Sequence, residues 1–302
     1  MLSAFTDSLL ARYSAGLSST PGLDVLPTHS VDTPVGRVRV FDSGTDKPCV
    51  VFVPDGPNVI EHYERLIELL SPHVRVVCFD MPGFGFSLPD TSYQHSLDEG
   101  ARAVLGVLDK LRLQTATLAF SCANGFYALR AAQLAPQRIK HLVLSQTPSL
   151  IAMQAWTKII PWHLRVPVMG QLVAWFARRR FAHAWYLRAL PRATDARPYQ
   201  TRARHAFACG ACFSLAGVVQ GLCREPMDTL GTIATPCTVV WGSKDHSHKA
   251  TDPRSLLACV PHAEMVYFED CGHFPDVEQP ERYAALVISR VLMVAAQAQA
   301  QF

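Results

Sequence analysis

Four residues stand where they could form a site for nucleophilic catalysis. Ser121 and Cys122 lie side by side where the apolar run 117–120 gives way to a helix-like segment. Asp245 ends the later motif WGSKD, and His273 stands in CGHFP. A thiol or hydroxyl at a sharp turn after a strand can be deprotonated by a histidine, which an aspartate orients. These residue types together could therefore carry out acyl transfer through a covalent intermediate.

Short apolar runs that alternate with helix-like segments indicate the scaffold for these residues. The runs are 38–41, 49–53, 74–79, 117–120, 141–144, 237–241 and 264–268. This rhythm is typical of an α/β fold with a mostly parallel sheet flanked by helices. The first strands precede any clear crossover helix, which allows them to pair antiparallel.

Three motifs make the chain, from about residue 35 to its C-terminal helix, resemble the α/β-hydrolase fold superfamily. They are FDMPGFGFS (79–87), VVWGSKD (239–245) and EDCGHFPDVEQPERY (269–283). The resemblance implies that Asp245 is the acid and His273 the base of a catalytic triad. Asp80, in the first motif, is a rival acid, although its place in a turn favours a role in organising that loop.

The register of the nucleophile can be read in two ways. Laid without gaps on a typical family segment, Gly125 and Pro136 fall on matching positions and Cys122 falls on the nucleophile. Ser121 then stands where the family commonly has histidine. Sterics favour the other register, because the family surrounds its nucleophile with small residues at two positions before and after. Cys122 has phenylalanine and asparagine there, whereas Ser121 has two alanines. We take Cys122 as the predicted nucleophile and keep Ser121 as the alternative.

A cysteine nucleophile broadens the chemistry, because a thiolate is reactive once its pKa is lowered and its acyl-enzyme is a thioester. The leading prediction is an esterase or thioesterase that needs no metal or cofactor. The first alternative is an acyltransferase, since the resembling family includes both hydrolases and acyl-polymerising synthases with cysteine at this position. The second is a ligand-binding protein of the same fold with little turnover.

The resemblance also implies an oxyanion site. Its donors should be the backbone N–H of Ala123, which follows the nucleophile, and an N–H from the loop after the strand 49–53. The family motif His-Gly-x-Pro is replaced there by PDGP (54–57). Matching Pro57 to the family proline makes Gly56 the donor and aligns Tyr63 with a family aromatic. The other register would require an N–H from proline, which has none.

A helical stretch rich in Trp, Arg and Ala interrupts the α/β rhythm. We expect residues 1–144 and 231–302 to form the core and residues 145–230 to form a helical cap that contains much of the substrate pocket. The cap carries 11 Lys or Arg and three acidic residues, a net charge near +8, so the remainder is near −5. Such a lid could attract CoA or an acyl carrier protein. For Arg178, Arg179 and Arg180 a solvated face is the favoured interpretation.

The sequence also suggests a compartment. The first 16 residues predict a short amphipathic helix, not a secretory signal, because Asp7 and Arg12 interrupt the apolar pattern. Nine scattered cysteines fit a reducing cytoplasm, and the isolated pair Cys209 and Cys212 is a weak indication of metal binding. A pI near 8.4 without a recognisable module argues against nucleic acid. We do not expect membrane contact, because Trp and Arg recur at irregular intervals in the cap.

Overall fold

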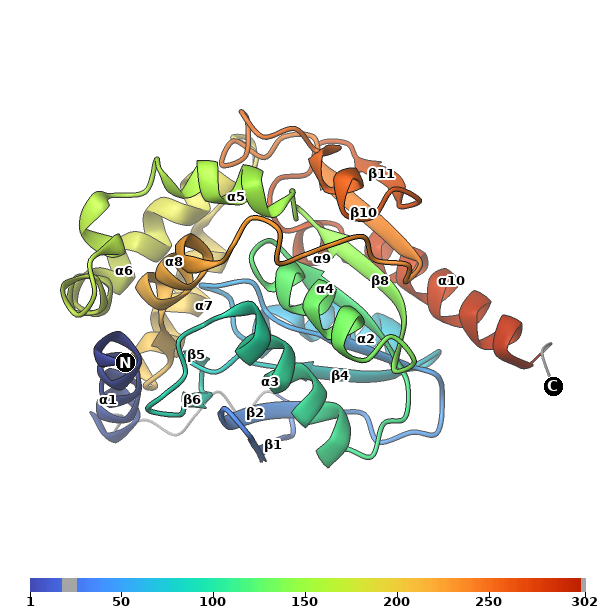
Figure 1. Ribbon diagram of the computed structural model, residues 1–302, viewed down its shortest axis with the longest axis horizontal. Coiled ribbons are helices and arrows are strands. Elements are labelled where there is room, and N and C mark those ends of the chain that lie inside the picture. Colours follow the sequence, from blue (N-terminus) through green and yellow to red (C-terminus); the bar gives the residue numbers. More distant parts are fainter. Residues whose placement is uncertain (18–25, 300–302) are drawn as a thin grey trace.

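The computed structural model describes residues 1–17 and 26–299 and shows one large sheet with helices on both faces (Figure 1). The sheet order is β1-β2-β4-β3-β7-β8-β10-β11, and β6 pairs with β2. The strands are β1 (Thr28–Thr33), β2 (Gly36–Asp42), β3 (Cys49–Phe52), β4 (Arg75–Phe79), β6 (Leu88–Pro89), β7 (Ala116–Ser121), β8 (Ile139–Ser145), β10 (Cys237–Gly242) and β11 (Glu264–Phe268). The predicted α/β class is therefore confirmed.

Strand β2 runs opposite to both of its neighbours in the sheet order. From β4 to β11 all neighbouring strands are parallel, whereas β2 pairs antiparallel with β1, β4 and β6. The antiparallel start agrees with the short connections between the first strands. Strand β1 was missed because its sequence, THSVDT, contains no apolar run and it lies at the sheet edge. All six residues of the central strand β7 are buried, as expected for a strand covered on both faces.

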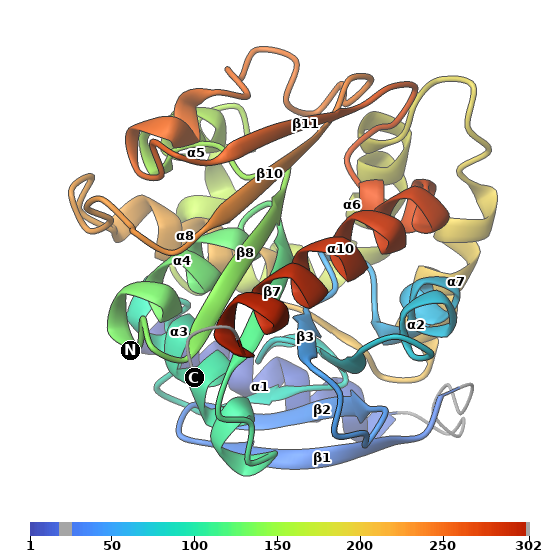
Figure 2. The ribbon, with the colours of Figure 1, turned by 90° about the vertical axis from the view of Figure 1, so that its right-hand side faces the viewer.

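Two helical layers enclose the sheet. Helices α3 (Leu97–Lys110) and α4 (Asn124–Leu134) cover one face, and α2 (Glu64–Leu70) and α10 (Pro280–Gln299) cover the other. Figure 2 shows α10 crossing in front of β7 and β8. The short helices are η1 (Ile60–Tyr63), η3 (Ser255–Ala258) and α9 (Pro275–Glu278).

Side chains of β7 alternate between these two layers. Leu118 and Phe120 pack in the cluster with α3 and α4, whereas Ala119 packs in the cluster with α2 and α10. Strand pleating therefore predicts that Ser121 and Cys122, at the end of β7, belong to opposite sides of the sheet.

The segment 145–230 lies beyond the carboxyl ends of the parallel strands, on the left of Figure 1. It contains α5 (Leu150–Thr157), η2 (Trp162–Arg165), α6 (Met169–Ala189), α7 (Arg197–Ala208), β9 (Cys212–Phe213) and α8 (Leu215–Arg224). Strand β9 pairs antiparallel with β5 (Phe84–Gly85), which ties the segment to the loop after β4. Helix α1 (Leu2–Leu17) packs against α6, α8 and β9. No helix among the described residues is long and apolar enough to cross a bilayer.

Candidate active site

The turn between β7 and α4 places Cys122 in an unusual backbone conformation. Its φ is +51°, in the left-handed region that non-glycine residues rarely adopt. The turn is held by the Cys122 N–H, which donates to Ser145 O at 2.8 Å, and by Thr147 Oγ1, which donates to Cys122 O at 3.0 Å. A Cβ on Gly125 would lie 2.2 Å from Thr147 Oγ1, so this position requires glycine. A residue held in such a sharp turn is a feature typical of functional sites.

Ser121 points the other way, into the core. Its Oγ donates to Asp276 Oδ2 at 3.0 Å, and the Tyr63 hydroxyl donates to the same oxygen at 3.1 Å. All three side chains are buried. Cys122, and not Ser121, lines the large cavity above the sheet. The structure therefore supports the register that places Cys122 at the turn.

Phe120 and Asn124, whose size disfavours this register on steric grounds, are both accommodated in the structure. Phe120 packs edge-on against Phe79, with ring centroids 6.4 Å apart. Asn124 Nδ2 donates to Pro54 O at 3.2 Å. The requirement for small residues falls instead on Gly125, at the next position.

Asp245 and His273 lie together next to Cys122. Asp245 Oδ2 is 2.7 Å from His273 Nδ1, and Gln146 Nε2 donates to the same carboxylate oxygen at 2.6 Å. Ser247 donates to Asp245 Oδ1 through its N–H and its hydroxyl. Burial opposes the charged carboxylate, but His273 and the hydrogen bonds lower the pKa of Asp245 to about 2. Asp245 is thus suited to orient a histidine and stabilise its cation.

Asp55 is a functional candidate that sequence reasoning missed. Its Oδ2 lies 3.0 Å from His273 Nε2, the ring nitrogen opposite the one that Asp245 contacts. The Sγ of Cys122 lies within 4.8 Å of a ring nitrogen of the same histidine. Asp55 therefore competes with the thiol for Nε2. The sequence did contain a signal, because Asp55 stands two positions after the apolar run that ends at residue 53, but the PDGP motif was interpreted for its backbone alone.

The site concentrates charge in a buried space. Burial opposes the His273 imidazolium, but Asp245, Cys122 and Asp55 together raise the pKa of His273 well above its ordinary value. Burial and the nearby Asp55 carboxylate raise the pKa of the Cys122 thiol, while His273 lowers it. Burial likewise raises the pKa of Asp55. The raised pKa of His273 favours its protonated form between the two carboxyl groups, and an ionised Asp55 disfavours the thiolate.

His248 forms a second aromatic contact with His273. The two imidazoles are stacked at 5.3 Å with an interplanar angle of 8°, and Trp156 stacks on the other face of His248 at 5.1 Å. Burial lowers the pKa of His248 to about 3, so its ring is neutral. One donor atom from each of Cys122, His248 and His273 falls within a 4.8 Å cluster. Parallel rings do not direct their lone pairs to one point, and both His273 nitrogens contact carboxylates, so the arrangement fits a tetrahedral metal poorly.

The predicted oxyanion donors lie beside the thiol. Ala123 and Gly56 both line the cavity, and the Ala123 N–H lies close enough to the Cys122 sulfur to lower the pKa of the thiol. A Cβ on Gly56 would approach Phe84 to 2.9 Å and Phe213 to 3.1 Å, so the loop requires glycine for close packing. Both residues therefore stay candidates for the two N–H donors of an oxyanion site.

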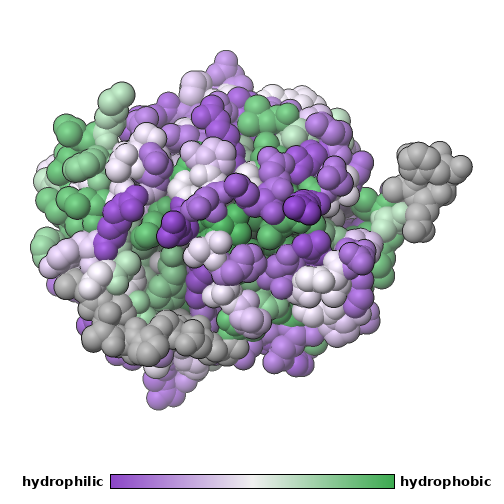
Figure 3. All heavy atoms as spheres, turned by 90° about the horizontal axis from the view of Figure 1, so that it is seen from below, coloured by the Kyte–Doolittle hydropathy of each residue, from purple (hydrophilic) through white to green (hydrophobic). Residues whose placement is uncertain are grey.

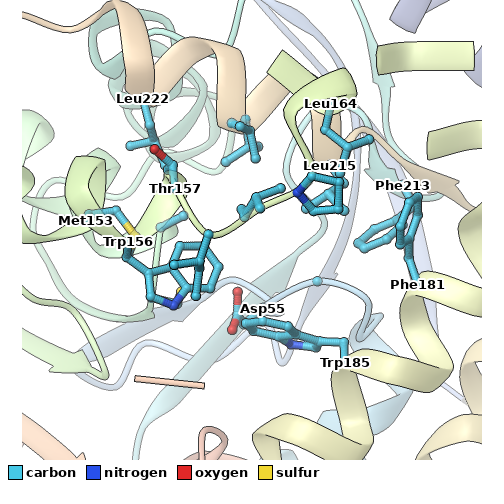
Figure 4. Close-up of a pocket in the computed structure, with 18 of the residues that line it drawn as sticks. Asp55, Met153, Trp156, Thr157, Leu164, Phe181, Trp185, Phe213, Leu215 and Leu222 are labelled. Carbon is cyan, nitrogen blue, oxygen red and sulfur yellow. The ribbon is translucent and has the colours of Figure 1, made fainter. Parts of the chain in front are cut away.

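A mostly apolar cavity of about 350 Å³ opens in front of Cys122. Figure 4 shows the Asp55 carboxylate pointing into it beside Trp185, with Met153 and Trp156 on one wall and Phe181 on another. Most lining side chains come from the segment 145–230. The remaining lining residues of that segment are Thr157, Ile159, Ile160, Pro161, Leu164, Ala184, Arg188, Phe213, Leu215, Val218, Val219 and Leu222. Such a volume suits a small molecule with an apolar body.

Asp80 takes part in a different network. Its Oδ2 accepts from Arg39 Nε at 2.9 Å and from the Phe86 N–H at 3.0 Å, and the same arginine binds Glu61 through both terminal nitrogens. These contacts hold the loop after β4, and no contact joins Asp80 to His273 in the described part of the chain.

The sequence and structure comparisons agree with this architecture. A family model described as "Alpha/beta hydrolase family" matches residues 50–286. The chain therefore belongs to the alpha/beta hydrolase family.

Relatives of the chain carry several hydrolase names. The chain is 27% identical over 293 residues to haloalkane dehalogenase 2 of Mycobacterium bovis, covering 90% of this chain and 98% of that protein. It is 26% identical over 266 residues to 2-hydroxymuconate semialdehyde hydrolase of Pseudomonas sp., covering 83% and 89%. A thermophilic esterase from Thermogutta terrifontis has a TM-score of 0.71 at 19% identity, covering 89% of this chain and 99% of that one. The structural likeness supports the fold, and the relatives support a hydrolase.

Proposed function

We propose that the protein hydrolyses an ester or thioester with an apolar acyl group through a covalent thioester on Cys122. The observation that carries the proposal is the geometry of Cys122. It occupies the strained turn after β7, faces the apolar cavity and lies within 4.8 Å of a His273 nitrogen, while His273 contacts Asp245 at 2.7 Å.

Acylation begins when the substrate carbonyl lies over Cys122 with its oxygen towards the N–H groups of Ala123 and Gly56. His273 Nε2 takes the thiol proton as the Sγ–C bond forms, and Asp245 stabilises the resulting imidazolium. Collapse of the tetrahedral intermediate breaks the bond to the leaving group, which receives the proton from His273. The products of this step are an alcohol or thiol and the thioester at Cys122.

Deacylation reverses these roles. A water molecule gives its proton to His273 Nε2 as its oxygen attacks the thioester carbonyl. The Sγ–C bond then breaks, and His273 returns the proton to sulfur.

Both half-reactions need His273 Nε2, so the contact between Asp55 and that nitrogen must break during turnover. An ionised Asp55 would also repel the oxyanion beside Gly56, so we infer that the reactive state contains a protonated Asp55, which its burial favours.

A cysteine nucleophile is poorly suited to reactions in which Cys122 would displace a leaving group from an alkyl carbon. Attack of Cys122 on an alkyl halide would form a thioether, which water does not cleave under mild conditions, whereas an acyl thioester is hydrolysable. The reaction proposed for Cys122 would therefore differ from the dehalogenation named in the relative haloalkane dehalogenase 2.

A second candidate function is displacement at an alkyl carbon with Asp55 as the nucleophile. Its carboxylate faces the cavity and contacts His273. An Asp55 oxygen could form a C–O bond to the alkyl carbon of a haloalkane as the carbon–halogen bond breaks and halide leaves, and water that His273 activates could then hydrolyse the resulting alkyl ester. Asp55 would then carry the covalent adduct in place of Cys122.

We further propose that residues 145–230 act as the cap, with the core formed by residues 1–144 and 231–302. Support comes from the cavity walls, most of which this segment contributes. Arg188 and Asp55 are the charged residues among the described lining residues, so the pocket itself favours an apolar acyl group over a polyanion such as CoA. Transfer from CoA or an acyl carrier protein would require the donor to bind outside the cavity.

Intact-protein mass spectrometry after brief exposure to p-nitrophenyl esters tests the proposal. An acyl adduct on Cys122 that is absent in Cys122→Ala but present in Ser121→Ala would support the thioester, and His273→Ala should form it slowly. Release as free acid indicates a hydrolase, and faster release with an added amine or thiol indicates an acyltransferase. A haloalkane adduct on Asp55 would favour the second candidate, and the absence of any adduct would favour ligand binding.

A further inference from the structure

Helix α1 exposes its apolar face. Leu2, Phe5, Leu9 and Tyr13 recur at three- and four-residue intervals, and each is more than half exposed. The opposite face, which is buried, consists of small and polar residues: Ser3, Ala4, Asp7, Ser8, Ala11 and Ser14. A surface helix in a globular protein normally has the reverse orientation.

Hydrogen bonds hold α1 in this orientation. Asp7 Oδ2 accepts from Gln171 Nε2 at 3.2 Å, and Ser8 Oγ donates to Pro89 O at 2.9 Å. At the other end of the helix, Trp175 Nε1 donates to Ser14 Oγ at 2.8 Å. Rotating α1 to bury its apolar stripe would break all three contacts, so the outward stripe is part of the packed structure.

The apolar surface continues onto the neighbouring helix α6. Tyr13 packs against Trp175 with ring centroids 5.7 Å apart, and Trp175 in turn packs against Phe176 at 4.9 Å. Phe176 is 75% exposed, and Leu172, one turn earlier, is also exposed. Trp162 in η2, which packs against α6, is exposed as well. Figure 3 shows green, hydrophobic side chains gathered on the left, the side on which Figure 1 places α1 and α6.

The exposed charges that α1 and residues 145–190 contribute to this surface are all positive, and exposed Asp90 of the neighbouring loop lies close enough to Arg12 for that charge to lower its pKa. Residues 145–190 contain no Asp or Glu, and Asp7, the one acid of α1, is buried. The exposed cations of the two regions are Arg12, Lys158, Arg165, Arg179, Arg180 and Arg188. None of them has a carboxylate within 4.0 Å among the described residues. An apolar, aromatic surface with flanking unpaired cations complements an anionic interface.

We propose that α1, η2 and the outer side of α6 form a face that binds the surface of an anionic phospholipid bilayer. The aromatic and aliphatic side chains enter the boundary between headgroups and acyl chains, and the arginines contact lipid phosphates. The expectation of no membrane contact considered the spacing of Trp and Arg within residues 145–230 and left out α1. The exposed stripe of α1 becomes visible only when the buried side of the helix is known.

The proposed face borders the opening of the cavity. Ile159, Pro161, Ala184 and Arg188 line the cavity and are exposed, and Trp162 is adjacent in sequence to Pro161. A bilayer against this face would lie next to the opening, so an apolar substrate could enter from the lipid phase. This consequence rests on the proposed function, whereas binding to the bilayer does not.

Vesicle co-sedimentation tests the proposal. We expect wild type and Cys122→Ala to pellet equally with vesicles of equimolar phosphatidylcholine and phosphatidylglycerol. Binding should weaken with phosphatidylcholine alone and at about 1 M salt, where screening acts within about 3 Å. The double variant Leu9→Ser/Phe176→Ser should bind at least about tenfold more weakly, because it removes two insertable side chains.

A matched double variant, Leu134→Ser/Leu292→Ser, controls for general loss of surface apolarity, since both residues are exposed on other helices. It should bind as wild type does. Equal binding of Leu9→Ser/Phe176→Ser and wild type would overturn the proposal, as would failure of wild type to pellet. A wild-type dimer in light scattering that Leu9→Ser/Phe176→Ser converts to monomer would also overturn it and assign the face to a second copy. Because Cys122→Ala is included, failure of catalysis and failure of membrane binding are separate outcomes.

Discussion

Ser121 and Cys122 are neighbours in sequence but belong to two different chemical regions. On the core side, Ser121 shares the Asp276 carboxylate with Tyr63 and is sealed from the cavity. On the cavity side, Cys122 meets His273 and Asp55 at an apolar pocket. Strand alternation and the positive φ of Cys122 decide which of the two side chains can reach a substrate. The Ser121 hydroxyl donates a hydrogen bond in the core, whereas the Cys122 thiol faces the cavity.

The largest effect should come from exchanging the two side chains for alanine in turn. We expect Cys122→Ala to lower kcat/KM for a p-nitrophenyl ester by about 10³-fold or more, because no nucleophile remains at the cavity. Ser121→Ala should stay within about tenfold of wild type and lose about 1–3 kcal/mol of folding free energy, because Asp276 loses a buried donor. The reverse pattern in kinetics and chemical denaturation would overturn the comparison.

Asp245→Asn should have the next largest effect on activity. The amide cannot stabilise the His273 imidazolium as a carboxylate does, so we expect kcat to fall by about 10²- to 10⁴-fold. Asp245 raises the pKa of His273, and this pKa, followed by imidazole NMR titration, should fall in the variant. Asp80→Asn is the control, since that acid binds Arg39. It should lower stability but leave the pH dependence of kcat unchanged for the folded fraction.

The variant Asp276→Asn tests how the buried carboxyl group next to Ser121 contributes to the pH dependence of folding stability. Burial raises the pKa of Asp276 to about 6, above the value of about 4 expected in the unfolded chain. The folded protein therefore binds the proton more tightly, and stability should rise as pH falls from 7 towards 4, by at most about 3 kcal/mol from this group. The variant should lose this part of the slope in urea denaturation at several pH values. An unchanged slope would mean that Asp276 does not titrate in this range.

Asp55→Asn should give the smallest effect, on thiol reactivity. The Asp55 carboxylate raises the pKa of Cys122, so removing its charge should lower that pKa and make the thiolate several-fold more abundant at neutral pH. The rate of Cys122 alkylation by iodoacetamide, followed by peptide mass spectrometry against pH, would measure it. Cys223, which is exposed, serves as an internal reference in the same samples. A slower reaction in the variant would show that Asp55 supports the thiolate.

Sequence patterns predicted the strands of the parallel sheet and the proximity of Asp245, His273 and Cys122. The strands rest on local signals, since apolar runs mark buried strands, whereas the proximity of the three side chains was implied by the resemblance of their motifs to the α/β-hydrolase family. Strand β1 was missed because edge strands need not be apolar.

The contacts of Asp55 and Asp276 could not be predicted in the same way. Asp55 meets His273 across 218 positions and Ser121 meets Asp276 across 155, so no local pattern reports either pair. The sequence likewise did not predict which face of α1 is buried. A period of three to four residues shows that a helix has two faces, but the polar partners supplied by Gln171 and Trp175 decide which face is buried.

The position of α1 has a practical consequence for handling the protein. Met1 is 93% exposed and directly precedes the helix whose apolar stripe points outward. Figure 1 shows α1 beside α6 at the left and the end of α10 far away at the right. A purification tag or sensor-chip linkage placed before Met1 would cover that stripe, whereas one attached beyond α10 would leave it free. Immobilisation chemistry thus selects which of the protein's surfaces an assay can detect.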